Sequence, residues 1–158
     1  MPHSADPVPP LAAPLPNDPR VASLYQEIIL SHYRAPQHKG TIPAATATVE
    51  HRNPLCGDVL TLQLQQDSGR ILDAAFAARA CSITQATASM LLDRVIGGSV
   101  TDAAALIARV DALIEGTTPD GDPDSLGDLR ALASVTRFPA RKACVRLVTG
   151  AISQAISA

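Results

Sequence analysis

The stretch DVLTLQLQQDSGRILDAAFAAR, residues 58–79, predicts a β-hairpin and decides how the rest of the chain is interpreted. In its first half, leucines at every second position alternate with polar residues, which is the period of a half-buried strand. The polar run at 67–70 contains a glycine and is typical of a turn, after which the chain returns as a second strand. With another strand expected at 46–51, these segments predict a small, three-stranded antiparallel sheet with one polar face.

A helix is expected before the sheet. Asn17-Asp18-Pro19 is a favourable start, because an Asx residue can cap a helix and proline fits its first turn. An apolar stripe with a 3.6-residue period follows, and Pro36 ends the segment. His32 lies on that stripe, so we interpret it as a structural histidine rather than a ligand.

The chain after the sheet is predicted to be mostly helical. We expect helices at 82–96, capped by Ser82, at 101–115, capped by Thr101, at 126–132, and from Pro139 onward, with an acidic loop at 116–124. This order of one helix, a β-meander and further helices predicts an α+β fold, with a three-stranded antiparallel sheet packed on one side by helices.

Composition and charge exclude several classes of function. The 158 residues carry a net charge of −2 and only 3% aromatic residues, so neither a phosphate backbone nor stacked bases are expected partners. No apolar run is long enough to span a bilayer, and the N-terminus does not resemble a secretory signal, so we expect a cytoplasmic protein without membrane contact. Residues 1–19 hold seven of the 13 prolines and are predicted to be a disordered arm, which leaves 20–158 as one folded domain.

The three cysteines suggest metal or sulfur chemistry. An odd number does not suit a disulfide framework in a chain without an export signal, and no C-x-x-C pair is present. Cys56 lies between proline and glycine in a turn before a strand, where a thiol is accessible. Asp58 follows two residues later. If the backbone is extended across Gly57, both side chains point the same way and could share a metal; alternatively, Asp58 orders its own turn.

The other two cysteines allow two interpretations each. Cys81 stands between a strand and a helix, where backbone N–H groups favour a thiolate, although a small buried residue is common there too. Cys144 lies on the apolar stripe of the last helix, which by itself favours a core residue. Arg141 lies one turn earlier on the same side, and its cation could hold a thiolate or pair with Asp58.

Four segments in order resemble one family. The opening helix from Leu24 to Pro36 is similar to that of the SufU proteins, a branch of the IscU/NifU N-terminal family. Asn53-Pro54-Leu55-Cys56-Gly57-Asp58 resembles the family motif N-P-x-C-G-D. The segment from Cys81 to Met90 resembles C-x-I-S-x-A-S-x-S-M with Thr at positions 84 and 87, and Phe138 to Cys144 resembles F-P-A-R-x-x-C.

The resemblance implies a site and a function. It implies that Cys56, Asp58, Cys81 and Cys144 bind zinc, with iron or an iron–sulfur cluster as the alternative. It implies that Cys56 accepts persulfide sulfur from a SufS-type cysteine desulfurase and that Arg141 assists there. The chain would be a sulfur acceptor rather than a free-standing turnover enzyme, and downstream iron–sulfur scaffold proteins would be further partners.

Two alternatives to this function stay open. One is an IscU-like scaffold that assembles an iron–sulfur cluster and passes it on. Residue 143 is alanine, whereas IscU-type scaffolds have histidine before the third cysteine, and the stretch 115–131 resembles an insertion typical of SufU; both favour the sulfur acceptor. The other alternative is a non-catalytic regulatory or binding domain that zinc merely stabilises.

Overall fold

The predicted sheet is present. The structure is a computed structural model, and it describes residues 18–158. Strands β1 (Ala47–Arg52), β2 (Val59–Asp67) and β3 (Arg70–Arg79) form an antiparallel sheet in the order β1-β2-β3. Every second side chain of β2 points into the core, and the leucines at 60, 62 and 64 are completely buried. The hairpin expected from residues 58–79 is therefore confirmed.

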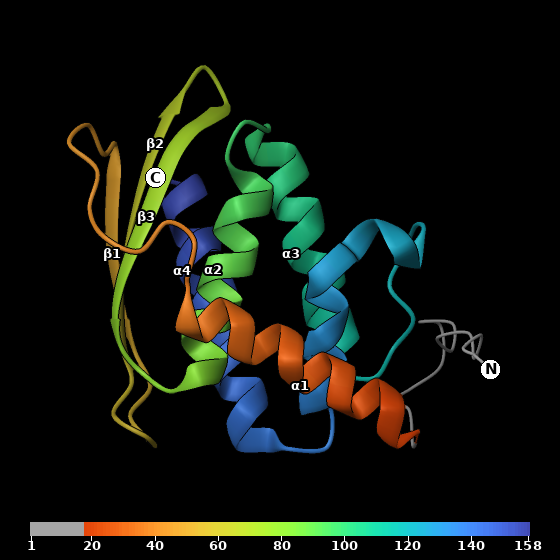
Figure 1. The fold of residues 1–158 in the computed structure, drawn as a ribbon. Helices are drawn as coiled ribbons and strands as arrows, with labels where there is room; N and C mark the ends of the chain where they lie inside the picture. The colour runs from red at the N-terminus through yellow and green to blue at the C-terminus, as the bar shows by residue number, and fades with distance from the viewer. Residues whose placement is uncertain (1–17) are drawn as a thin grey trace.

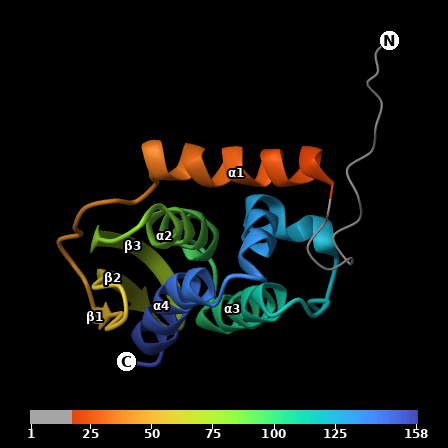
Figure 2. The same cartoon turned by 90° about the horizontal axis from the view of Figure 1, so that it is seen from below.

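Five helical segments accompany this sheet. They are α1 (Pro19–Arg34), α2 (Ser82–Val95), α3 (Val100–Ile114), the 3₁₀ segment η1 (Pro123–Val135) and α4 (Pro139–Ile156). Helix α4 packs on β1 and β2 and against α2, so helices cover one face of the sheet (Figure 1). Helix α1 lies across α2 and η1 at the edge of this layer (Figure 2). The predicted α+β fold with a one-sided helical layer is confirmed.

Helix starts were predicted with mixed success. Asp18 caps α1 by accepting a hydrogen bond from the backbone N–H of Arg20 at 2.9 Å, as expected. The expected caps Ser82 and Thr101 are wrong, because α2 is capped at Cys81 and α3 at Ser99. Ser99 accepts from the N–H of Asp102 at 3.0 Å, a bond that a residue inside the first turn cannot make.

The segment between α3 and α4 is longer than predicted. It begins at Pro123 rather than near 126, and Gly127 interrupts it with a backbone φ of 55° and ψ of −132°. Two guanidinium groups hold this segment, because Arg94 donates to the carbonyls of Ser125 and Leu126, and Arg109 donates to that of Asp122.

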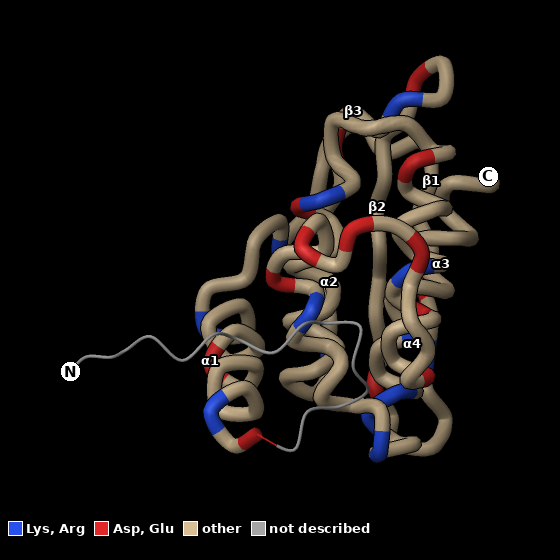
Figure 3. The backbone as a smooth tube through the Cα atoms, turned by 90° about the vertical axis from the view of Figure 1, so that its right-hand side faces the viewer, with Lys and Arg blue, Asp and Glu red and all other residues tan. Residues whose placement is uncertain are grey.

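Two further expectations concern the chain as a whole. Of the arm predicted at 1–19, residues 1–17 lie outside the described residues. Asp18 caps the first helix, and Pro19 begins it. Lys and Arg are interspersed with Asp and Glu along the described backbone (Figure 3). Among the residues that the structure describes, no helix has both the length and the apolar character needed to cross a membrane.

Candidate metal centre

Three predicted ligands meet where β2 begins. The Sγ atoms of Cys56 and Cys144 and a carboxylate oxygen of Asp58 all lie within 4.8 Å of one another. Cys56 and Asp58 come from the β1–β2 connection, and Cys144 comes from α4, which packs beside both strands. Residues separated by almost ninety positions are thus brought into one group by the packing of the helix on the sheet.

The turn that carries Cys56 is held by Asn53. The side chain of Asn53 accepts from the N–H of Leu55 at 3.0 Å, and its backbone N–H donates to the carbonyl of Asp58 at 2.9 Å. Gly57 has a φ of +75°, so the backbone is not extended there, yet Cys56 and Asp58 still lie close enough to share a metal. A left-handed residue, which glycine adopts without strain, closes the turn and returns Asp58 toward the thiols.

The side chain of Asp58 faces helix α2. The residue is 7% exposed, and Oδ2 accepts from the hydroxyl of Thr84 at 3.0 Å and from the backbone N–H of Cys81 at 3.3 Å. The start of a helix favours a negative group, because its first N–H groups have no partner within the helix. The backbone carbonyl of Asp58 also closes the turn by accepting from the N–H of Asn53, so the two interpretations left open by the sequence do not exclude each other.

Cys81 adjoins this group from the start of α2. It is the N-cap residue of the helix, and its Sγ lies 3.3 Å from the Sγ of Cys144. Cys81 is exposed, as is Cys56, whereas Cys144 is buried. The accessible thiols therefore lie on the outside of the centre and the buried thiol on the inside.

The electrostatics of Cys144 favour a bound cation. Burial, the neighbouring thiol of Cys81 and the charge of Asp58 together raise the pKa of its thiol to about 12, against a hydrogen bond with Thr84 that lowers it, and no described cation contributes to the shift. Three sulfurs and one carboxylate form a donor set that suits tetrahedral zinc, with Zn–S bonds of about 2.3 Å. The residues present therefore fit a zinc ion, which would supply the missing positive charge.

Arg141 and His32 have other partners among the described residues. The guanidinium of Arg141 stacks over the ring of Phe138, 4.5 Å from its centroid, and residues 18–158 contain no ion pair between Arg141 and Asp58. Of the two alternatives left open for Arg141, an ion pair with Asp58 is therefore not formed among the described residues, and its part in holding a thiolate stays a prediction. His32 bonds Ser89 at 2.9 Å and Asp128 at 3.0 Å, which confirms its structural role.

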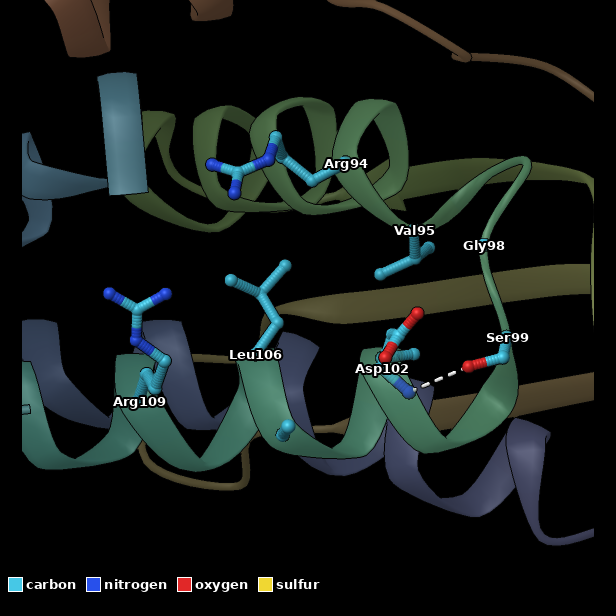
Figure 4. Close-up of a pocket in the computed structure, with 9 residues that line it drawn as sticks. Arg94, Val95, Gly98, Ser99, Asp102, Leu106 and Arg109 are labelled. Atoms are coloured by element: carbon cyan, nitrogen blue, oxygen red, sulfur yellow. Dashed lines mark hydrogen bonds between the residues drawn. The ribbon is translucent and has the colours of Figure 1, made fainter. Parts of the chain in front are cut away.

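A pocket of about 220 Å³ lies elsewhere, between the end of α2 and α3 (Figure 4). Arg94 and Arg109 line it, and their guanidinium groups extend toward the segment that they hold by its carbonyls. Asp102 and Ser99 line its other end, where Ser99 caps α3. These polar groups already hold neighbouring helical segments together. The pocket contains none of the residues of the thiol centre, which are Cys56, Asp58, Cys81 and Cys144.

Comparison with known proteins identifies the family. The sequence profile of the NifU-like N terminal domain matches residues 24–145, a span that includes every residue of the thiol centre. The chain belongs to this family. The family expected from the four motifs is therefore confirmed.

Named relatives of this NifU-like chain fall into two groups. It is 36% identical over 133 residues to the "Iron-sulfur cluster assembly scaffold protein IscU" of Streptococcus pyogenes serotype M1, covering 84% of this chain and 82% of the relative. It is 33% identical over 135 residues to the "Zinc-dependent sulfurtransferase SufU" of Bacillus subtilis (strain 168), covering 85% and 90%. The first name refers to iron–sulfur cluster assembly and the second to zinc-dependent sulfur transfer.

Solved structures support the fold. An iron–sulfur cluster assembly scaffold protein for the SUF system from Fervidobacterium islandicum AW-1 superposes with a TM-score of 0.76 at 24% identity, covering 85% of this chain and 97% of that chain. The N-terminal part of a NifU-like protein from Brucella abortus gives a TM-score of 0.72 at 25% identity, covering 87% and 94%.

Two residues of the centre were missed as such by the sequence reasoning. Asn53 and Thr84 stand inside the quoted motifs, but neither was assigned a role. An Asx residue before proline is a recognisable turn signal, so Asn53 could have been found. Thr84 contacts a residue 26 positions away, and nothing in its local sequence points there.

Proposed function

We propose that this chain is a zinc-dependent sulfur acceptor of iron–sulfur cluster assembly. Cys56, Asp58, Cys81 and Cys144 hold the metal, and Cys56 receives sulfur from the persulfide of a cysteine desulfurase of the SufS type. The observation that carries the proposal is an exposed Cys56 thiol within 4.8 Å of a buried carboxylate and a buried thiol. A relative at 33% identity is named a zinc-dependent sulfurtransferase.

The four ligand residues have different tasks. Zinc supplies a redox-inert positive charge that keeps thiols as thiolates without oxidising them. Cys144 and Asp58 are buried and anchor the centre from within. Cys81 links the centre to the start of α2. Cys56 stands in a turn whose preceding residue, Leu55, is 89% exposed, so a second protein can reach it.

The transfer step moves one sulfur atom from the donor's persulfide to Cys56. The Cys56 thiolate attacks the outer sulfur of the donor's persulfide, and a new S–S bond forms on Cys56. The S–S bond of the donor breaks, and the donor cysteine leaves as a thiolate that takes up a proton. No oxidant is needed, because one persulfide is exchanged for another. Arg141, exposed one turn before Cys144, provides a cation toward the incoming anionic sulfur.

A second candidate is a scaffold that assembles a cluster on the same residues. The 36% identity to a protein named as a scaffold favours it. The described group that could share an ion consists of two cysteines and an aspartate, and the residue before Cys144 is Ala143. Thiolates and carboxylate can also bind iron, so the donor set alone does not separate the candidates.

Metal content and desulfurase turnover separate them. We expect one zinc per chain after aerobic purification and an increase in turnover of a SufS-type desulfurase when the protein is added. Cys56→Ser should abolish the increase, and Cys81→Ser should lose zinc as well. Iron with sulfide, or zinc without any effect on turnover, would contradict the sulfur-acceptor function, and the first of these results would support the scaffold.

A further inference from the structure

Thr84 lies at the centre of the contacts behind the proposed ligands. Its side chain is completely buried in the first turn of α2. Its Oγ1 atom is 3.0 Å from Oδ2 of Asp58 and 3.6 Å from the Sγ of Cys81. One hydroxyl thus contacts two ligands that come from different parts of the fold.

The chemistry of a hydroxyl fixes the direction of these contacts. A hydroxyl carries one proton to donate and two lone pairs to accept with. An ionised carboxylate can only accept, so the hydroxyl of Thr84 donates its proton to Asp58, and the contact with the Sγ of Cys81 at 3.6 Å is longer. Bonds to an ionised group are about twice as strong as neutral ones, which makes the Asp58 contact the dominant one.

These contacts hold the carboxylate of Asp58 in one orientation. Oδ2 of Asp58 is surrounded by the Thr84 hydroxyl, by the N–H of Cys81 and by the thiol of Cys144 at 3.8 Å. Oδ1 makes no hydrogen bond within residues 18–158. Fixing one oxygen fixes the rotation of the carboxylate, so the other oxygen has a defined direction.

We propose that Thr84 is a positioning residue of the metal centre, which orients Asp58 for zinc through its hydroxyl. The inference rests on the proposed zinc site and gives a role to Thr84, a motif residue that is not itself one of the four ligands. Partners that orient ligands in this way commonly change metal affinity by about 10-fold to 100-fold when they are removed.

A second threonine on the same helix provides the comparison. Thr87 is also completely buried, but its hydroxyl donates to the carbonyl of Ile83 at 2.7 Å, one turn back in its own helix. Thr84 bonds Asp58 instead of a carbonyl of its helix. Replacing each by valine removes the same atom from the same helix, and only one replacement touches the centre.

Three variants test the inference. Thr84→Val keeps the volume and removes the hydroxyl, Thr84→Ser keeps the hydroxyl and removes a methyl group, and Thr87→Val is the matched control. Zinc affinity is measured by competition with a chromophoric chelator, and the Co²⁺-substituted protein gives an absorption spectrum that reports the ligands. Thermal unfolding of each metal-free variant measures any general loss of stability.

We expect Thr84→Val to weaken zinc binding by about 10-fold or more and to alter the Co²⁺ spectrum. Thr84→Ser should restore both properties to near wild type, even though its lost methyl group lowers the unfolding temperature. Thr87→Val should bind like the wild type. If Thr84→Val binds like Thr87→Val, or if Thr84→Ser fails as badly as Thr84→Val, the inference is wrong while the zinc site stands. If the wild type binds no zinc, the proposed function itself is wrong.

Discussion

At the scale of single residues, each thiol acquires its meaning from its neighbours. Cys144 on its own resembles a core residue, and it is indeed 6% exposed. Its Sγ nevertheless lies 3.3 Å from that of Cys81 and 3.8 Å from Oδ2 of Asp58. The Sγ of Cys144 therefore lies beside two other possible metal ligands although the residue is buried, so burial does not exclude a ligand function for Cys144.

Arg141 should act in transfer without holding the metal. Its guanidinium stacks on Phe138 and forms no ion pair with Asp58 within the described residues. We predict that Arg141→Ala slows sulfur transfer about 10-fold, retains one zinc per chain, and changes stability by about 1 kcal/mol or less, the range of an exposed cation–π contact. Desulfurase-coupled turnover and metal analysis measure the two effects.

The control for Arg141 is Arg70→Ala. Arg70 begins β3, at the opposite end of that strand from Cys81. The Arg70→Ala variant should accept sulfur at the rate of the wild type. Equal slowing in both variants, or loss of zinc in Arg141→Ala, would show that Arg141 has no specific part in transfer.

Asp111 gives the stability a pH dependence of known sign. Burial raises the pKa of its carboxyl above the usual value, against a hydrogen bond from Thr149 at 3.1 Å. A raised folded-state pKa means that its stabilising contribution is present below the unfolded-state pKa and is lost as pH rises through the folded-state pKa. The ionised carboxylate of Asp111 therefore lowers the free energy of unfolding at neutral pH.

Asp111→Asn should remove this destabilising effect of the ionised carboxylate. Asparagine still accepts a bond from Thr149, so we predict a gain of a few tenths of a kcal/mol in the free energy of unfolding at neutral pH. The gain should vanish below about pH 4, where aspartate is protonated in both states. Urea unfolding of both proteins across this range measures it, and a gain that grows in acid would contradict the sign.

At the scale of elements, the start of α2 does most to build the centre. Two residues lie between the end of β3 and the helix, and the side chain of Cys81, the N-cap residue, makes no capping hydrogen bond. Instead, the carboxylate of Asp58 accepts the N–H of Cys81 from outside. Ser82 was the expected cap because its residue type is favourable, but the end of β3 places the helix start one residue earlier.

Helix α3 offers a direct test of which residue caps it. We predict that Ser99→Ala lowers the free energy of unfolding by about 1 kcal/mol, because the N–H of Asp102 loses its acceptor. Thr101→Ala, at the position expected from the sequence, should be close to neutral, since Thr101 is exposed inside the first turn. Urea unfolding compares them, and the reverse order would mean that the helix begins later than it does here.

At the scale of the whole molecule, the sequence predicts single elements better than it predicts contacts between distant residues. The alternating leucines in β2 predict a strand because nearby residues in the sequence show which side of the strand is buried. The meeting of Cys56, Cys81 and Cys144 depends on the packing of α4 against β2 and α2, which no spacing encodes. Only the family resemblance joined these residues, and local reasoning left each one ambiguous.

The sheet-to-helix core should dominate stability. Leu62 is completely buried opposite Phe76, so we predict that Leu62→Ala costs about 2–5 kcal/mol. Leu72 on the neighbouring strand is 50% exposed and is a matched control, with an expected loss of about 1 kcal/mol or less. Thermal and urea unfolding measure both, and similar losses would show that the sheet does not bury its inner face as described.

The central claim is that Cys56 is the sulfur acceptor of a metal centre shared with Asp58, Cys81 and Cys144. Its most direct test is mass-spectrometric mapping of sulfane sulfur after the zinc-loaded protein is incubated with a SufS-type desulfurase and cysteine. The account predicts one added sulfur atom on the peptide that contains Cys56, and none on any peptide of Cys56→Ser. Sulfur on Cys81 or Cys144 instead, or no added sulfur at all, would contradict it.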